Sequence, residues 1–235
     1  QPKKILSARD GRARPPPDVG GSFLGGVHDR PPELHPDLFT VSSVDHAPRL
    51  LVRGQLANSY ILAEGDDGLF IIDQHAAHER ILFERFLSRS KRGPLPAQTL
   101  LFPSTIDLSP AEMETLSDSP AMFERLGFEL EPFGITTYAI RAIPADLNIE
   151  SAEDFVRDLL SELQNEGSAD EKTERALHTL ACRSAVKFGD PLDQQEMQAI
   201  IEGLRTIPRR DFCPHGRPSV LHLSDDTLRK AFRRK

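Results

Sequence analysis

The sequence predicts an α+β fold of strands and amphipathic helices, although periodicity alone does not give their arrangement in space. Two short apolar runs flank a Gly-containing loop at residues 64–68, which is the pattern of a β-hairpin. Several longer stretches repeat apolar residues at the i, i+3, i+4 spacing of a helix with one buried face. With 38% hydrophobic and 28% charged residues among 235, the composition is that of an ordinary globular protein.

The first expected elements follow a head rich in proline and glycine. Residues 1–39 contain too few apolar side chains to offset the entropy of ordering, so we expect a linker there. Residues 39–52 are harder to assign. The hairpin strands are expected at 60–63 and 69–72, and a helix follows from Asp73 to about Ser90. Its apolar face consists of Leu82, Phe83, Phe86 and Leu87.

The middle of the chain alternates strand and helix signals. We expect a strand at 99–106 and a helix that begins at Ser109-Pro110, because proline is favoured in the first turn. Two strands are expected at 128–133 and 137–143. Ser151 opens the next helix, and residues 164–169 read as a polar loop.

The last third is mostly helical. Helices are expected at 173–188 and at about 192–204, on the strength of their apolar stripes. A strand at 219–223 and a basic helix at 225–234 close the chain.

Composition and charge also limit the function. The net charge of −7 argues against strong, autonomous binding to nucleic acid, which usually needs a basic domain. No apolar stretch approaches the roughly 20 residues that cross a bilayer, and no signal peptide is recognisable, so we expect no membrane association and a cytoplasmic location. The chain begins with Gln1 and not Met, which we interpret as a sign of a longer parent protein.

Titratable side chains are densest where the second hairpin strand meets its helix. Asp73 is expected to be held rigidly from both sides, while His75 and Glu79 lie four positions apart and share one helix face. An imidazole and a carboxylate beside a fixed Asp suit a divalent cation. The commoner explanation is a surface hydrogen bond. However, the same face continues to apolar Leu82 and Phe86, where a carboxylate needs a partner.

The neighbouring residues have plainer interpretations. His78 lies off that face and receives no role, and Glu84 is expected to form a salt bridge with Arg80. Residues 75–79 have neither the H-E-x-x-H nor the H-x-x-E-H order of metalloproteases, which makes that function a weak alternative.

The chain has two cysteines, Cys182 and Cys213, and a reducing cytosol would keep them unpaired. Cys213 and His215 would point the same way in an extended segment and form half of a zinc-type site, although such a tripeptide alone is a poor signal. Cys182 alone is most simply a packed core thiol. Together with Asp73, His75 and Glu79 they would supply O, N and S ligands for one or two metals.

Three widely separated motifs then stand out. Residues 73–84 match the pattern D-Q-H-A-x-x-E-x-x-x-x-E, and residues 213–218 match C-P-H-G-R-P. Residues 181–186 are similar to A-C-K-x-A-I, with Arg183 in place of Lys and Val186 in place of Ile. By these motifs residues 38–235 resemble the C-terminal endonuclease and dimerisation region of bacterial MutL-type mismatch-repair proteins. Residues 55–61 also resemble the first strand of that family.

The resemblance implies an activity and a site. It makes Asp73 the essential catalytic carboxylate, with Glu79 beside it. The implied metal shell consists of His75, Glu79, Cys182, Cys213 and His215. Manganese would support nicking of one DNA strand, and zinc would bind in the same region with a structural or regulatory role. Arg217 would either contact a phosphate or brace its own loop.

A further match concerns a partner. Residues 98–103 resemble the Q-x-x-L/I-x-P peptide that binds the replication sliding clamp, through Gln98, Leu101 and Pro103. The alternative is that Leu100, Leu101 and Phe102 simply form a core strand. A clamp already on DNA would supply the tethering that an acidic surface lacks.

The resemblance also implies how the chain is organised. Residues 40–93 and 173–235 would form a dimerisation subdomain, with residues 94–172 inserted as a regulatory subdomain. The expected partners are a second copy of the chain, double-stranded DNA held weakly, and, through an N-terminal half outside these residues, MutS and ATP. The expected location is the nucleoid of a bacterial cytoplasm.

A rival interpretation keeps the dimer and the clamp but makes the metal site purely structural. Family members without nuclease activity generally lack D-Q-H-A, so its presence in this chain favours the enzyme.

Overall fold

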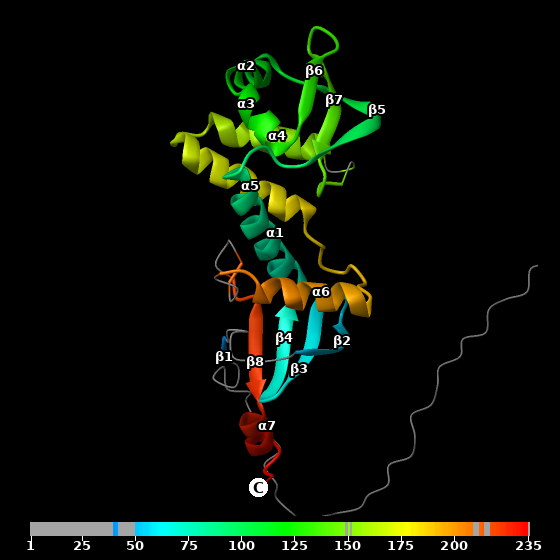
Figure 1. The fold of residues 1–235 in the computed structure, drawn as a ribbon, viewed down its shortest axis with the longest axis vertical. Coiled ribbons are helices and arrows are strands. Elements are labelled where there is room, and N and C mark those ends of the chain that lie inside the picture. The colour runs from blue at the N-terminus through cyan, green and yellow to red at the C-terminus, as the bar shows by residue number, and fades with distance from the viewer. Residues whose placement is uncertain are drawn as a thin grey trace, which may run out of the picture. The chain divides into compact units, whose positions relative to one another are not determined.

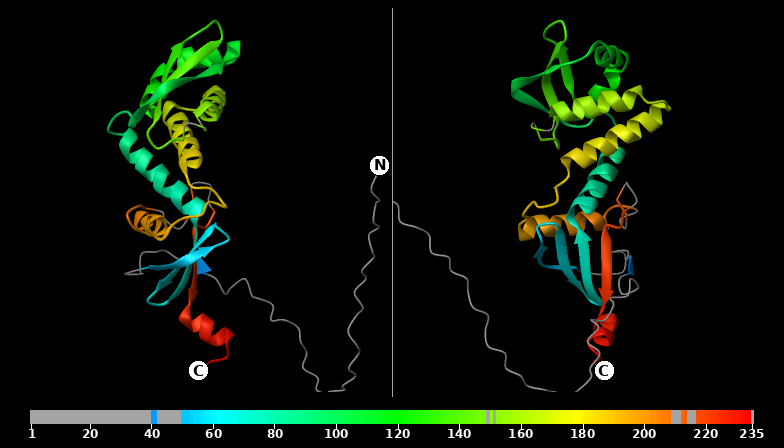
Figure 2. Two further views of the ribbon diagram at one scale, coloured as in Figure 1. Left: turned by 90° about the vertical axis from the view of Figure 1, so that its right-hand side faces the viewer. Right: turned by 180° about the vertical axis from the view of Figure 1, so that it is seen from behind.

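The computed structural model describes residues 40–41, 50–148, 150, 152–208, 212–213 and 217–234. The expected linker at 1–39 lies outside these residues. Within them the chain forms two antiparallel sheets and seven helices, which confirms the α+β prediction (Figures 1 and 2). None of the described helices is both long and apolar enough to cross a bilayer.

One sheet has five strands in the order β1-β8-β4-β3-β2. The strands are β1 (Thr40–Val41), β2 (Leu51–Leu56), β3 (Tyr60–Gly65), β4 (Gly68–Asp73) and β8 (Val220–Ser224). The predicted hairpin is β3–β4, but its turn contains only Asp66 and Asp67. Gly68 has φ +148°, and a Cβ there would lie 2.3 Å from the Leu223 carbonyl oxygen, so only glycine lets β8 approach β4 this closely.

The other sheet has three strands in the order β5-β7-β6. The strands are β5 (Ala97–Asp107), β6 (Glu129–Pro132) and β7 (Thr137–Pro144). Pairing of β5 with β7 is interrupted between Thr99 and Ser104, so the four residues between them leave the ladder as an irregularity.

Seven helices accompany the sheets. They are α1 (Gln74–Ser90), α2 (Pro110–Asp118), α3 (Pro120–Leu126), α4 (Ala152–Gln164), α5 (Ala169–Ser184), α6 (Gln194–Arg205) and α7 (Asp225–Ala231). The sequence did not predict α3, which has Pro120 in its first turn and is ended by Gly127 in the left-handed conformation.

The helix expected at 173–188 was wrong at both ends. α5 begins at Ala169, because Ser168 and Glu171 form a capping box there. It ends at Ser184, and Ala185 already has extended backbone with φ −71° and ψ 150°. The residues that follow α5 therefore form a loop, and this loop contacts the start of α1.

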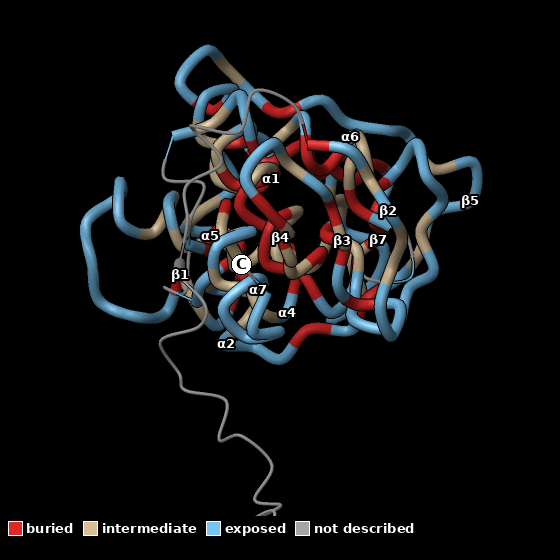
Figure 3. The backbone as a smooth tube through the Cα atoms, turned by 90° about the horizontal axis from the view of Figure 1, so that it is seen from below, coloured by how far each residue is buried: buried red, intermediate tan, exposed pale blue. Residues whose placement is uncertain are grey.

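Two apolar clusters stabilise these elements, and the buried segments are red in Figure 3. The first cluster combines the three-stranded sheet with α2 to α5 and with Leu82, Phe83 and Phe86 of α1. The second packs α6 against one face of the five-stranded sheet and includes Ala77, also from α1. Helix α1 thus contributes to both clusters. The first cluster contains residues from both sides of the predicted subdomain boundaries, and those boundaries remain a prediction.

The opposite face of the five-stranded sheet is also apolar. Leu62, Ile71 and Leu221 are neighbours across β3, β4 and β8. They are only half-buried and belong to neither cluster, although Ile61, Ile72 and Val220 on the other face are fully buried. The sheet therefore presents a second apolar surface that the described elements do not fully cover.

Candidate functional site

Asp73 lies where β4 passes into α1, as the sequence predicted. Its Oδ1 accepts the Ala76 N–H at 2.9 Å and so caps the helix. Its own N–H donates to the Ser219 carbonyl oxygen at 3.0 Å. Because Ser219 directly follows residues 213–218, this bond brings the end of the third motif to the start of the first.

Gln74 has a structural role that the sequence did not suggest. Its side chain is fully buried at the start of α1. Its Nε2 lies 2.9, 2.8 and 3.1 Å from the carbonyl oxygens of Asn58, Lys187 and Asp190, and its Oε1 accepts a hydrogen bond from Gln55 at 2.6 Å. The amide thus joins the β2–β3 turn to the loop after α5.

The same loop contacts two histidines of α1. His75 Nδ1 is 2.8 Å from the Val186 carbonyl oxygen, while the Val186 N–H donates to His78 Nδ1 at 3.1 Å. His78, which received no role from the sequence, is thus a link between α1 and the second motif. Its contact residue lies 108 positions away, which no local pattern reveals.

His78 is expected to make the chain sensitive to acid. Burial first, and then the positive charge of Arg85, lower its pKa from 6.5 to about 4. The unfolded chain therefore takes up a proton near pH 6.5, and the folded chain only near pH 4. Stability is complete above pH 6.5 and is lost as the pH falls, by about 2 to 3 kcal/mol at pH 4.5.

The measurement is the free energy of urea unfolding between pH 7.5 and 4.5, in the presence of a chelator, for the chain and for His78→Asn. The variant lacks this titration, so its stability should fall less steeply. Parallel profiles would contradict the assigned shift.

Glu79 is buried, with 2% of its surface exposed, which rules out a pair on the surface. Its Oε1 is 3.6 Å from His178 Nε2 on α5. Cys182 also faces this carboxylate, one helical turn beyond His178. Burial and then the charge of Glu79 raise the pKa of the Cys182 thiol. The structure thus brings the first and second motifs together at Glu79.

Sequence reasoning missed His178. Its position four residues before Cys182 was a usable signal, since that spacing puts both side chains on one face of a helix. Glu84, by contrast, is as predicted, since it accepts a hydrogen bond from Arg80 at 2.5 Å. Glu84, Arg80 and His178 line a cavity of about 530 Å³ between α1 and α5.

The third motif is described only in part. Cys213 is buried, whereas Cys182, whose simplest interpretation was a packed core thiol, is only half-buried. The Cys213 N–H donates to the carbonyl oxygen of Arg217 at 2.8 Å, and Arg217 itself is exposed. His215 lies outside the described residues. Within the part of the chain that is described, no three His, Cys, Asp or Glu side chains are grouped so that they could hold a metal ion.

The segment that resembles a clamp-binding peptide is on the surface. Leu101 and Phe102 are 88% and 80% exposed, and Pro103 is exposed as well. Gln98 is also exposed and donates a hydrogen bond from Nε2 to the Leu147 carbonyl oxygen. Only Leu100 packs against the first cluster. The alternative of a core strand is therefore wrong for Leu101 and Phe102.

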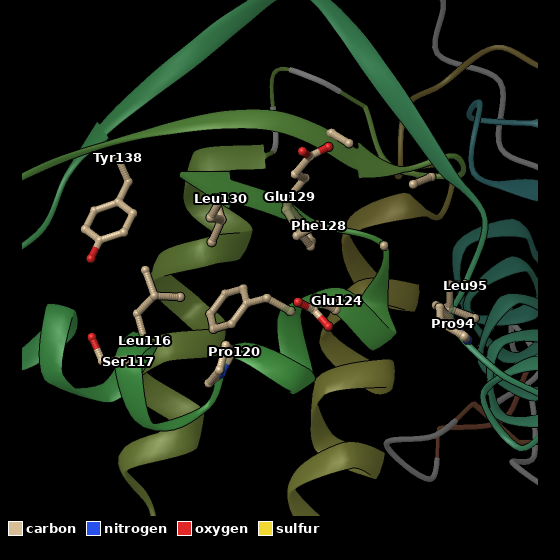
Figure 4. A pocket seen from close by; sticks show the side chains of 14 residues that line it. Pro94, Leu95, Leu116, Ser117, Pro120, Glu124, Phe128, Glu129, Leu130 and Tyr138 are labelled. Atoms are coloured by element: carbon tan, nitrogen blue, oxygen red, sulfur yellow. The ribbon is translucent and has the colours of Figure 1, made fainter. Parts of the chain in front are cut away.

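A cavity of about 580 Å³ lies elsewhere, between α2, α3 and the three-stranded sheet (Figure 4). Leu116, Leu130 and Tyr138 are among its lining side chains. None of the three motifs contributes to it, so we do not include it in the site.

Comparison with known proteins finds a matching family model and several relatives. Residues 53–192 match the model of the MutL C terminal dimerisation domain. The DNA mismatch repair protein MutL of Halothermothrix orenii is 38% identical over 187 residues, which are 78% of this chain and 29% of that protein. That of Symbiobacterium thermophilum is 40% identical over 187 residues, 77% of this chain and 29% of the relative.

The MutL of Methanothrix thermoacetophila is 38% identical over 190 residues, covering 80% of this chain and 34% of that protein. The chain therefore spans about a third or less of the length of these relatives. The matched family model covers more than half of the chain and includes the first two motifs. The chain belongs to the family of MutL C-terminal dimerisation domains.

Proposed function

We propose that this chain is a metal-dependent DNA nicking endonuclease that acts as a homodimer in mismatch repair. The observation that carries the proposal is the buried Glu79 carboxylate of α1, which faces Cys182 of α5. Asp73 caps the N-terminus of the same helix α1. A carboxylate and a thiol that face each other offer the oxygen and sulfur donors that divalent cations bind in proteins.

The donor types fit the proposed ions. Carboxylate oxygens suit manganese, and thiolate and imidazole suit zinc. The residues that would hold the ions are His75, Glu79 and Cys182, joined by Cys213 and His215 from the third motif. A bound divalent cation would polarise the phosphate and lower the pKa of a water ligand.

Asp73 would act directly on the reacting water. Its Oδ1 is engaged by the N-terminus of α1, so we assign the water to Oδ2. The cap and the Ser219 contact hold the carboxylate on rigid elements, which is what a catalytic group requires. Arg217, which is exposed, remains available for a phosphate.

The test is conversion of supercoiled plasmid to the open circular form, with manganese and with a chelator, in the presence of a sliding clamp. The Asp73→Asn variant is the comparison. Equal nicking by both proteins would remove Asp73 from the mechanism. If the unmodified chain dimerised and bound the clamp but did not nick DNA, the rival function would remain, which is a dimerisation and clamp-docking module with a structural metal site.

We assign the dimer interface to the half-buried apolar face of the five-stranded sheet. Leu62, Ile71 and Leu221 lie at its centre. A family of dimerisation domains needs a self-complementary apolar surface, and this face is one that the chain's own described elements leave incompletely covered.

Ile71→Glu is expected to weaken the dimer about 30-fold or more, because it places a charge at the centre of an apolar interface. Analytical ultracentrifugation would show the shift to monomer. Ile135→Glu is the matched control, since Ile135 is 96% exposed in the β6–β7 turn and should leave the dimer intact. An unchanged dimer in Ile71→Glu would move the interface elsewhere.

We further propose that residues 98–103 bind the sliding clamp. Their exposed apolar side chains have no role in the core, and the net charge of −7 makes tethering through another protein useful. DNA would be bound weakly by the chain alone, and MutS and ATP would act through other parts of a longer protein, at the nucleoid.

The double variant Gln98→Ala, Leu101→Ala is expected to lose about 10-fold or more in clamp affinity while remaining dimeric, because it removes a polar and an apolar anchor. Surface plasmon resonance on immobilised clamp measures this. Phe133→Ala removes a similarly exposed apolar side chain from the β6–β7 turn and should bind normally. Wild-type affinity in the double variant would exclude this segment.

A further inference from the structure

The backbone of Val186 lies between two imidazoles of α1. Its carbonyl oxygen is 2.8 Å from His75 Nδ1, and its N–H lies 3.1 Å from His78 Nδ1. The two hydrogen bonds engage different peptide units, so together they hold both φ and ψ of Val186. The Val186 side chain packs against the second cluster, and Gln74 binds the next carbonyl along, that of Lys187.

Hydrogen-bond polarity decides which nitrogen of each ring carries the proton. An amide N–H can only donate, so His78 Nδ1 must be an unprotonated acceptor and the proton of that ring lies on Nε2. A carbonyl oxygen can only accept, so His75 Nδ1 must carry a proton. One residue of the second motif thus requires opposite tautomers in two histidines of α1.

We propose that Val186 fixes His75 as its Nδ1–H tautomer, with Nε2 as the nitrogen that binds a cation, and that His78 is a positioning residue that holds Val186 for this purpose. Free neutral histidine prefers the Nε2–H tautomer, so the reverse state at His75 needs such a cause. With the proton on Nε2, His75 would turn a lone pair toward the Val186 oxygen at 2.8 Å and would have no nitrogen for a metal.

A metal-binding histidine typically donates its other ring N–H to a carbonyl or carboxylate, which fixes the ring and its tautomer. In this chain the carbonyl is that of Val186, which lies in the loop after α5 and must be held in place by other contacts. His78 supplies part of it from the same helix, three residues beyond His75, so the ring and its carbonyl partner are held by one rigid element. Only the identity of what Nε2 binds rests on the proposed function.

The test is long-range ¹H–¹⁵N NMR of the ¹⁵N-histidine-labelled chain at pH 8 with a chelator, which distinguishes protonated from bare ring nitrogens. We expect protonated Nδ1 and bare Nε2 at His75, and the reverse at His78. His78→Asn keeps an acceptor near the Nδ1 position and should preserve the His75 tautomer. His78→Leu should shift His75 towards a mixture containing Nε2–H.

Zinc titration of the same proteins gives a second readout. His78→Leu should bind zinc about 10-fold more weakly, and His78→Asn should bind nearly as well as the unmodified chain. A bare Nδ1 at His75 in the unmodified chain would overturn the proposal, even if His78→Leu failed to fold. An unchanged His75 tautomer in folded His78→Leu would overturn the role of His78. The expected tautomers without any nicking would refute only the proposed nuclease.

Discussion

Asp73→Asn is expected to reduce manganese-dependent nicking about 100-fold or more and to leave the fold almost unchanged. The amide loses the negative charge and the basicity that we assign to Oδ2, and loss of a general base typically costs a factor of that size. Asparagine caps helices about as well as aspartate, so the bond to the Ala76 N–H survives. We expect the free energy of unfolding to fall by no more than about 1 kcal/mol, through the lost charge at the helix N-terminus.

The chain offers a matched control for this substitution. Asp193 caps α6 as Asp73 caps α1, with its Oδ1 accepting the N–H groups of Gln195 and Glu196. Asp193→Asn therefore makes the same chemical change at a helix N-terminus outside the three motifs. It should nick at the normal rate. A similar loss of nicking in both variants would mean that the effect comes from the helix cap and not from catalysis.

Gln74→Leu is expected to destabilise the chain by about 2 to 4 kcal/mol. The leucine keeps the volume but removes the donor shared by the carbonyl groups of Asn58, Lys187 and Asp190, and unpaired buried polar groups cost about 1 to 3 kcal/mol each. Water can reach part of these exposed loops and hydrogen-bond some of the carbonyl groups, so the loss of stability is smaller than the sum of three unpaired groups. Urea unfolding at pH 7.5 measures the change.

Two further substitutions separate the causes. Gln74→Glu keeps the shape but places a carboxylate oxygen where the amide nitrogen faces carbonyl oxygens, so it should destabilise at least as much as Gln74→Leu. Gln164→Leu changes an exposed glutamine at the end of α4 and should alter stability by less than about 0.5 kcal/mol. A stable Gln74→Glu would show that the hydrogen bonds of Gln74 matter little.

The sequence predicted those elements whose signals are local. The β3–β4 hairpin, α1 and α4 were each recognisable from apolar spacing and from turn or capping residues nearby. The missed start of α5 also had a local signal, because Ser168 and Glu171 form a capping box. β2 was not clearly recognisable, because its pairing with β3 is interrupted between Val52 and Gly54 and because apolar Leu51 is at an exposed position.

The residues of the candidate site also differ in whether a local sequence signal could predict their contacts. Asp73 at a strand–helix junction was predicted from its neighbours in the sequence. For Glu79 the apolar face of the same helix indicated the need for a partner, although a surface pair was the commoner expectation, and the carboxylate is in fact buried. The contacts of His78 and His178 could not be predicted, since their partners come from another element about a hundred positions away. The family motifs supplied Cys182 and Cys213, but no motif predicted that Gln74 would be a structural amide.

Helix α1 has a consequence for any attempt to dissect this chain. Its Ala77 belongs to one apolar cluster and its Leu82, Phe83 and Phe86 belong to the other. Excising residues 94–172 would strip the cover from these three side chains, each worth roughly 1.5 to 3 kcal/mol when buried. The helix that carries proposed nuclease residues therefore belongs to both apolar clusters. Residues 94–172 and the rest of the described chain should therefore unfold in one cooperative transition, and neither part should stay folded as an isolated fragment.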